Sequence, residues 1–399
     1  MKLTHQFSSC DLYIFLWILY NLQGTLYASG GSISQVLLAI LLAWSVVNCF
    51  RLSSKDTYHS VYFRGLNVLM LVFTIYGLLL IIMGTELYIT EGANKKVRNF
   101  VYLKEIYTSL LPIYSFFLFA KKGKLTEKSL KRWFFIFIIV GTLQYARSQR
   151  EAVLLAMMQG WEPDGITNNS GYIFVSLLPG LILLRKKPMI QYLGLTLCMF
   201  LILASMKRGA IIVGVLSVIL LFSYQLRFSS SRKKAGVMFL IMLVSVASYF
   251  AVTYMLESND YFNSRIQATL EGNSSHRDEI YSSLFRTFIY DTSLFQMLLG
   301  RGAWGTLTVS FNFAHNDWLE ILTNQGLLGI IVFIYYWICF LKNCKDVNLP
   351  SESRICLYML LLIYFMKTIF SMSYSDMSIY STSVLALCLA GGIGAPSKS

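Results

Sequence analysis

Two short stretches of the sequence contain residues whose types and spacing could do chemistry. The first reads SMKRGAII and places Lys207 and Arg208 between two apolar runs, and the second contains GRGAWG and then AHNDWLE, with Arg301 and His315. Arginine stays protonated at physiological pH, and its planar guanidinium donates paired hydrogen bonds to phosphate oxygens. Histidine, whose unperturbed pKa is about 6.5, can accept a proton from a hydroxyl group. The two stretches therefore combine candidate phosphate ligands with a candidate general base.

Two carboxylates follow the histidine. Asp317 lies two residues after His315, and Glu320 lies one helical turn after Asn316, so either carboxylate could orient the imidazole or face the same outer cavity. Both features also have a structural explanation. A carboxylate in the first turn of a helix stabilises the N-terminus, and a histidine at a helix start can equally be structural. The sequence leaves both interpretations open.

Further arginines collect in the long segment 257–316, which separates two apolar regions and carries Arg265, Arg277, Arg286 and Arg301. Long loops of this kind are usually functional. Clustered arginines suit a lipid-linked pyrophosphate, but they could also contact ordinary lipid headgroups or pair with acidic residues of the same loop.

Arg208 differs from these loop arginines because only a few polar residues separate it from hydrocarbon on both sides. A charge in that position is costly unless it is used, although snorkelling to the outer headgroups is an alternative.

Part of the loop is predicted to be an amphipathic helix. Ile280 and Leu284 recur at helical spacing, and Ser275 is placed as the N-cap. Such a helix would lie on the membrane surface or cap the helix bundle. Arg277 and Arg286 would lie on opposite faces of it, because each residue turns a helix by about 100°.

The chain that must position these residues is predicted to be an all-α polytopic membrane protein. Of its 399 residues, 56% are hydrophobic and only 14% are charged. Windows of about 17 to 25 apolar residues, enough to cross roughly 30 Å of hydrocarbon, predict about twelve transmembrane helices. They lie near residues 12–28, 33–50, 66–84, 105–120, 133–149, 171–184, 189–205, 210–226, 235–256, 318–341, 355–370 and 377–391. Residues 1–399 then form a single integral-membrane domain.

Charge predicts the orientation of the chain. Most of the 34 lysines and arginines fall in segments that lie inside if the N-terminus is cytoplasmic, so both termini are predicted to be cytoplasmic. The net charge of +14 is then topogenic and requires no nucleic-acid partner. All seven cysteines fall in spans or inner segments, and no cysteine or histidine spacing is typical of a metal site. We therefore expect no metal and no cofactor.

These motifs carry a resemblance to a known family. GRGAWG and AHNDWLEILTNQGLLGIIVFI resemble the C-terminal signature of the O-antigen polymerase and O-antigen ligase superfamily, and SMKRGAIIVGV resembles the arginine-bearing turn that precedes it there. The layout is similar as well, with one large outer loop between the arginine-bearing half and the histidine-bearing span. The resemblance covers roughly residues 205–333, whereas the first half is similar only in being a set of membrane helices.

The resemblance implies a metal-independent, inverting glycosyltransferase with a GT-C-type fold. It would act on undecaprenyl-pyrophosphate-linked sugars at the periplasmic face of the bacterial inner membrane. By position, Arg208 matches an arginine thought to hold the pyrophosphate, His315 matches the proposed base, and Arg301 matches a basic loop residue before the histidine motif. Arg277 and Arg286 fall where family members often carry loop arginines. Fixed arginines would stabilise the leaving pyrophosphate while the base activates an acceptor hydroxyl.

Several functions stay open. A polymerase would extend O-antigen, capsule or exopolysaccharide, and a ligase would transfer the glycan to lipid A core. We favour the polymerase because polymerases are more numerous in such a family. The expected partners are the lipid-linked oligosaccharide, membrane lipid and, for a polymerase, a chain-length regulator protein. A transporter would require ionisable residues deep in several spans, and a receptor would make His315 dispensable, so both rank lower.

Overall fold

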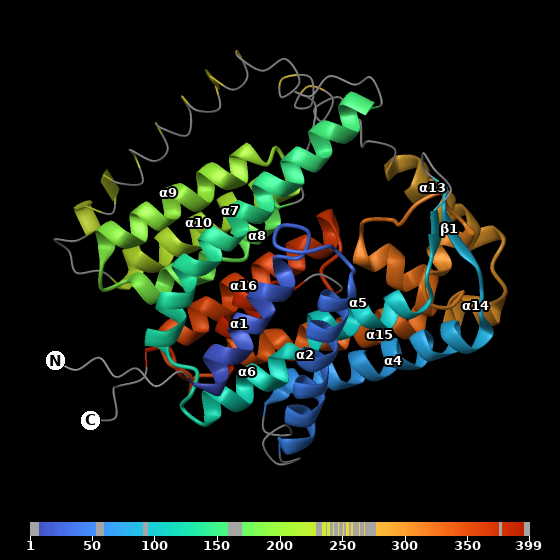
Figure 1. Cartoon of the computed structure of the whole chain (residues 1–399), viewed down its shortest axis with the longest axis horizontal. Helices are drawn as coiled ribbons and strands as arrows, with labels where there is room; N and C mark the ends of the chain where they lie inside the picture. The colour runs from blue at the N-terminus through green and yellow to red at the C-terminus, as the bar shows by residue number, and fades with distance from the viewer. Residues whose placement is uncertain are drawn as a thin grey trace. The chain divides into compact units, whose positions relative to one another are not determined.

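The computed structural model describes residues 8–52, 60–90, 95–158, 170–228, 277–374 and 377–394, together with scattered positions between 234 and 267. This described part is mostly helical, as predicted for an all-α membrane protein (Figure 1). The chain forms two compact units. The first unit comprises Met1–Phe134 and His276–Ser399, and the second comprises Phe135–Ser275.

The first unit is built from helices and one small β-hairpin. Its elements are α1 (Ser9–Asn21), α2 (Ser32–Arg51), α4 (Val61–Met83), β1 (Leu87–Ile89), β2 (Lys95–Val97), α5 (Phe100–Leu110), α6 (Pro112–Lys121), the start of α7 (Glu127–Met158), α13 (Arg277–Tyr290), α14 (Leu294–Leu299), η3 (Gly305–Thr308), α15 (Asp317–Cys344), α16 (Ser351–Phe370) and α17 (Ile379–Leu389). The strands are antiparallel, with Leu87 opposite Val97.

Helices α4 and α15 lie side by side in the first unit although they are far apart in the sequence (Figure 1). Tyr62 and Tyr336 meet edge to face with ring centroids 5.8 Å apart, and their hydroxyls are 3.3 Å apart. Tyr62 also meets Phe340 edge to face at 5.1 Å. Aromatic pairs add to the stabilisation from burial, so this seam fixes α15 against an N-terminal helix.

The second unit contains the rest of α7 and the elements α8 (Gly171–Val175), η2 (Leu178–Leu184), α9 (Pro188–Ala204) and α10 (Arg208–Phe228). Two glutamines connect these apolar elements. Gln191 Nε2 donates to the Leu181 carbonyl at 2.8 Å, and Gln225 Nε2 donates to Gln191 Oε1 at 3.0 Å. Such amide bonds hold helices together where apolar surface gives no preference between partner helix and lipid.

Within the described ranges, five helices are long and apolar enough to cross a membrane by length and composition: α2, α4, α10, α15 and α16. Shorter apolar helices cover Gly171–Leu184, Pro188–Ala204 and Ile379–Leu389. The predicted span 105–120 holds two helices, α5 and α6, because Pro112 begins a new helix and cannot donate the backbone hydrogen bond that would continue the first. The predicted span 235–256 lies outside the continuously described residues.

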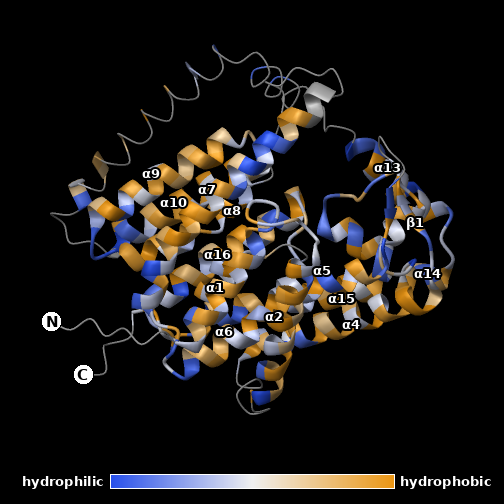
Figure 2. Ribbon diagram, in the orientation of Figure 1, coloured by the Kyte–Doolittle hydropathy of each residue, from blue (hydrophilic) through white to orange (hydrophobic). Residues whose placement is uncertain are grey.

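The hydropathy of the first unit changes along its length. Helix α4 exposes apolar side chains such as Leu71 and Ile82, the second of them 78% exposed, as a lipid-facing helix would. Hydrophilic residues gather around α13 and β1 (Figure 2). The apolar surface indicates a membrane-embedded protein, and the hydrophilic part of this unit includes Arg277, the first residue of α13.

Candidate active site

His315 directly precedes the N-terminus of α15. Asn316 is the N-cap, and its Oδ1 accepts from the backbone N–H groups of Trp318 and Leu319 at 3.0 and 3.2 Å. Its Nδ2 donates to the Ile369 carbonyl at the end of α16 at 3.3 Å. His315 itself is half-buried and has a φ of 52°, in the left-handed region. The cap therefore fixes the direction in which the chain enters α15, immediately after a residue with a strained backbone.

Glu320 binds the chain that leads to the histidine. It is fully buried, and its Oε1 accepts from the Ala314 N–H at 2.5 Å while its Oε2 accepts from Thr306 Oγ1 at 2.7 Å. Asn324, one turn further along α15, donates to the same Oε2 at 3.3 Å, and its Oδ1 accepts from the Thr306 N–H at 3.0 Å. The sequence interpretation allowed Glu320 to face an outer cavity. In the structure its carboxylate instead holds the residue before His315.

Helix α15 is broken at Gly326, whose φ of 66° and ψ of −159° are not helical. The arginine-bearing loop binds carbonyls of the turn that precedes the break. The Arg301 N–H donates to the Thr323 carbonyl at 2.9 Å, and the Gly302 N–H donates to the Asn324 carbonyl at 3.0 Å. We call this pairing the glycine clasp. It satisfies backbone groups that would be costly to leave unpaired in a membrane-embedded helix.

The clasp requires glycine where the two backbones approach. A Cβ added at Gly300 would lie 2.3 Å from the Asn324 carbonyl oxygen, and one added at Gly326 would lie 2.6 Å from the backbone of Leu298 and Gly300. Both glycines also have positive φ. Gly300 of GRGAWG and Gly326 of NQGLLG therefore allow close backbone contact.

Arg301 has its guanidinium on the loop between α13 and α14. Its Nη2 donates to the Asp291 carbonyl at 3.3 Å and lies 3.5 Å from Thr292 Oγ1, and the residue is half-buried. These are neutral acceptors, so the charge of Arg301 is not neutralised by them. An arginine held in this way presents a fixed positive charge to an anionic ligand.

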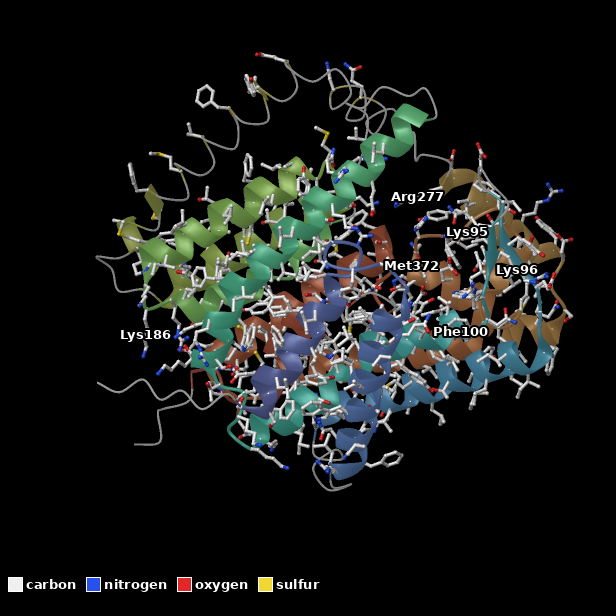
Figure 3. All side chains as sticks on the ribbon, viewed as in Figure 1. Lys95, Lys96, Phe100, Lys186, Arg277 and Met372 are labelled. Atoms are coloured by element: carbon white, nitrogen blue, oxygen red, sulfur yellow. The ribbon has the colours of Figure 1, made fainter. Side chains whose placement is uncertain are left out.

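The predicted amphipathic helix is observed as α13. Ile280 and Leu284 are buried and pack with Ala314 and Leu319, so the helix covers the histidine segment. Arg277, at its start, donates from Nη1 to the Phe370 carbonyl at 3.2 Å. Figure 3 labels this residue together with lysines of the hairpin. Arg286 is exposed. The structure thus gives these two arginines different surroundings.

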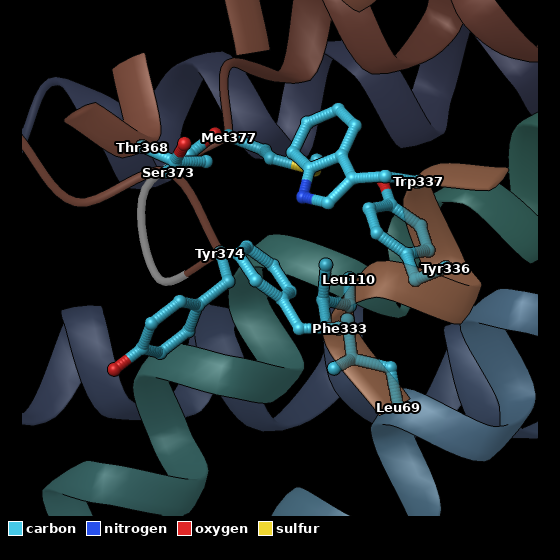
Figure 4. Close-up of a pocket in the computed structure, with 9 residues that line it drawn as sticks. All are labelled: Leu69, Leu110, Phe333, Tyr336, Trp337, Thr368, Ser373, Tyr374 and Met377. Carbon is cyan, nitrogen blue, oxygen red and sulfur yellow. The ribbon is translucent and has the colours of Figure 1, made fainter. Parts of the chain in front are cut away.

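Asp317 is also fully buried, and its Oδ2 accepts from the Ser373 N–H at 2.8 Å. Ser373 and Trp337 line a cavity of about 10 Å³, with room for about one water molecule (Figure 4). Trp337 Nε1 and Ser373 Oγ are buried without a hydrogen-bond partner among the described residues. Asp317 therefore fixes the α16–α17 connection against the start of α15, and it is not placed as a surface ligand.

The N-terminal half contributes to this region, which sequence reasoning missed. Thr90, after β1, donates its N–H to the Phe311 carbonyl at 3.0 Å, and the Gln325 side chain donates to the Tyr102 hydroxyl at 3.0 Å. Tyr76 donates to the Leu299 carbonyl. No spacing in the sequence links these tyrosines to the clasp. The sequence indicates only that tyrosine hydroxyls within apolar helices need hydrogen-bond partners.

The hairpin itself carries an exposed ion pair. Lys96 Nζ binds Glu86, and the two side chains are 54% and 59% exposed. The hydrogen bond from Lys96, followed by that from Tyr88, holds the pKa of Glu86 below its usual value. An adjacent cleft of about 330 Å³ is lined by residues that include Arg98 and Phe100.

The other candidate residues belong to the second unit. Lys207 precedes α10 and donates its N–H to Ser205 Oγ at 3.3 Å, while Arg208 is the first residue of α10. Arg265 lies outside the described residues. Among the described residues, no group of three histidines, cysteines or carboxylates could hold a metal ion.

Each of the three motifs identified in the sequence contains a residue with a strained backbone. In the described part of the chain, the non-glycine residues with positive φ are Met206, Trp304 and His315. One lies in SMKRG, one in GRGAWG and one in AHND. Such residues cost about 1–3 kcal/mol each and cluster at functional sites. The strain therefore supports a functional role for all three stretches.

Comparisons with known proteins add no family assignment. No protein-family model matches the chain, and no curated protein matches it significantly. The functional conclusion therefore depends on the chemistry of the described residues and on the motif resemblance.

Proposed function

We propose that the protein is a membrane glycosyltransferase that joins lipid-pyrophosphate-linked glycan units, as a polysaccharide polymerase does. One observation carries the proposal: the arginine-bearing loop and the histidine segment are both bound to the first turns of α15. The Arg301 N–H donates to the Thr323 carbonyl, and the Ala314 N–H, next to His315, donates to Glu320. A fixed cation and a candidate base are thereby tied to one rigid helix.

This arrangement fits inverting transfer from a lipid pyrophosphate. As the anomeric bond breaks, negative charge develops on the leaving group, and Arg301 can stabilise it without reorganisation. His315 then accepts the proton of the acceptor hydroxyl as that hydroxyl attacks from the opposite side. The resemblance gives Arg208 the task of holding the pyrophosphate, so Arg208→Ala is expected to stop transfer.

The remaining details of the proposal follow from the resemblance. They are a GT-C-type fold with about twelve spans, a site facing the periplasm of the bacterial inner membrane, cytoplasmic termini, and no metal or cofactor. The buried hydrogen bonds of Glu320 and Asp317 support positioning roles for both residues and leave Arg301 and His315 as the groups that would contact substrate.

Reconstitution of the full chain in liposomes tests the proposal. The protein is supplied with undecaprenyl-pyrophosphate-linked repeat units, with or without lipid A core, and the products are resolved by length on a gel. A ladder formed from the repeat units alone is expected of a polymerase. Product that requires lipid A core would assign a ligase instead. Absence of product under both conditions would refute glycosyl transfer.

A further inference from the structure

A buried polar network lies between the arginine-bearing loop and the histidine segment. Thr306, Glu320 and Asn324 are each 0% exposed. Thr306 uses both its hydroxyl and its backbone N–H in the network, since the hydroxyl donates to Glu320 and the N–H donates to Asn324 Oδ1. Buried polar groups are costly when unpaired, so a network that pairs all of its members strongly favours one geometry.

The network is hydrogen-bonded to the backbone N–H of a residue adjacent to each candidate site residue. On one side, Glu320 accepts from the N–H of Ala314, the residue before His315. On the other side, the Asn324 carbonyl accepts from the N–H of Gly302, the residue after Arg301. Because Glu320 and Asn324 are one turn apart on α15, the two attachments are separated by a fixed helical distance.

We infer that Thr306, Glu320 and Asn324 are positioning residues that set the separation between Arg301 and His315. This inference rests on the proposed function and deepens it. In an inverting transfer, the group that stabilises the leaving pyrophosphate and the group that activates the acceptor act on opposite sides of one anomeric carbon. A misplacement of about 1 Å can cost about 100-fold in rate. The network holds that separation without touching substrate.

Thr306→Val gives the sharpest test because it removes one hydroxyl and keeps the volume. Glu320 then loses a donor, so the transfer rate constant kcat should fall at least tenfold while KM for the lipid-linked donor changes less than threefold. Thr306→Ser restores the hydroxyl and should return kcat to within about threefold of wild type. Thr308→Val is the matched control, since this exposed threonine of the same η3 turn donates to the Gly305 carbonyl and not to the network.

Amide hydrogen exchange provides a readout that does not depend on catalysis. The Ala314 N–H lies outside any helix but donates to a buried carboxylate, so wild-type protein should protect it. Thr306→Val should accelerate its exchange at least tenfold, and Thr308→Val should leave it unchanged. Rapid exchange at Ala314 in wild type would overturn the inference even if the variant failed to fold.

The two readouts separate the inference from the proposed function. If wild type forms no glycan product, the proposed function fails and the exchange data alone decide whether the network holds Ala314. If wild type is active but Thr306→Val changes neither kcat nor exchange, the positioning role is refuted and the transferase remains. Loss of activity in Thr306→Val that Thr306→Ser does not restore would also contradict the inference.

Discussion

Two glutamates in the first unit make hydrogen bonds of similar kinds in opposite surroundings. Glu320 is fully buried and accepts from Thr306, Ala314 and Asn324. Glu86, beside the hairpin, accepts from Lys96 and Tyr88 while its side chain stays 59% exposed. Water can replace the partners of the exposed glutamate but not those of the buried one. Burial, and not the number of bonds, should therefore decide which glutamate the fold depends on.

We expect the largest loss of stability from a substitution at Gly300, where there is no room for a side chain. Gly300→Ala would place a Cβ against the Asn324 carbonyl, at a φ of 76° and ψ of −170° that only glycine adopts readily. The glycine clasp could not close, and the free energy of unfolding should fall by about 3 kcal/mol or more. Thermal unfolding in detergent measures this change.

Gly302→Ala is the control for that substitution. Gly302 also has a positive φ, of 95°, but no atom lies within 4 Å of an added Cβ. Its cost should be only the backbone strain, about 1 kcal/mol. Equal destabilisation by the two substitutions would mean that close backbone approach is not what the clasp requires.

Glu320→Ala tests the contribution of the buried glutamate to stability. It removes the acceptor of the Ala314 N–H and of the Asn324 amide and leaves the Thr306 hydroxyl only Asn324 Oδ1, at 3.1 Å, so we expect a loss of about 3 kcal/mol. Glu86→Ala should lower the unfolding midpoint only slightly because water replaces its partners. Similar midpoints for the two variants would show that burial does not set the difference.

The smallest effect concerns pH. Because Lys96 holds the pKa of Glu86 below its usual value of 4.5, the pair contributes stability above that pH and loses it as pH falls through the lowered pKa. Wild type should therefore lose slightly more stability than Glu86→Gln between neutral and acidic pH. An identical pH dependence of the unfolding midpoint in both proteins would show that the Glu86–Lys96 pair contributes no pH-dependent stability.

The sequence predicted the helix that follows His315 well. The apolar run after Asp317 indicated a span near 318–341, and the helix is Asp317–Cys344. Asn316 is a favourable N-cap, and a long apolar window is the strongest sequence signal of a membrane helix. Helix α13 was also predicted from its apolar spacing, whereas its predicted N-cap, Ser275, lies outside the described residues.

The break in α15 could not be predicted in the same way. Glycine is tolerated inside membrane helices, so Gly326 alone does not indicate whether the helix continues. The arginine-bearing loop binds carbonyls of the turn before Gly326, and this contact between distant segments has no signal in the sequence. The burial of Asp317 and Glu320 likewise depends on tertiary partners, Ser373 for one and Thr306 for the other. The division of the predicted span 105–120 into α5 and α6 had a signal in the sequence, since proline disrupts a helix interior and Pro112 lies inside that window.

The central proposal is that His315, which follows the residue bound by the buried network, activates the acceptor in glycosyl transfer. The most direct measurement compares wild type with His315→Ala in liposomes containing undecaprenyl-pyrophosphate-linked repeat units, at equal amounts of inserted protein with equal unfolding midpoints. We predict a glycan ladder for wild type and at least a 100-fold slower transfer for the variant. A ladder formed by His315→Ala at the wild-type rate would contradict the claim.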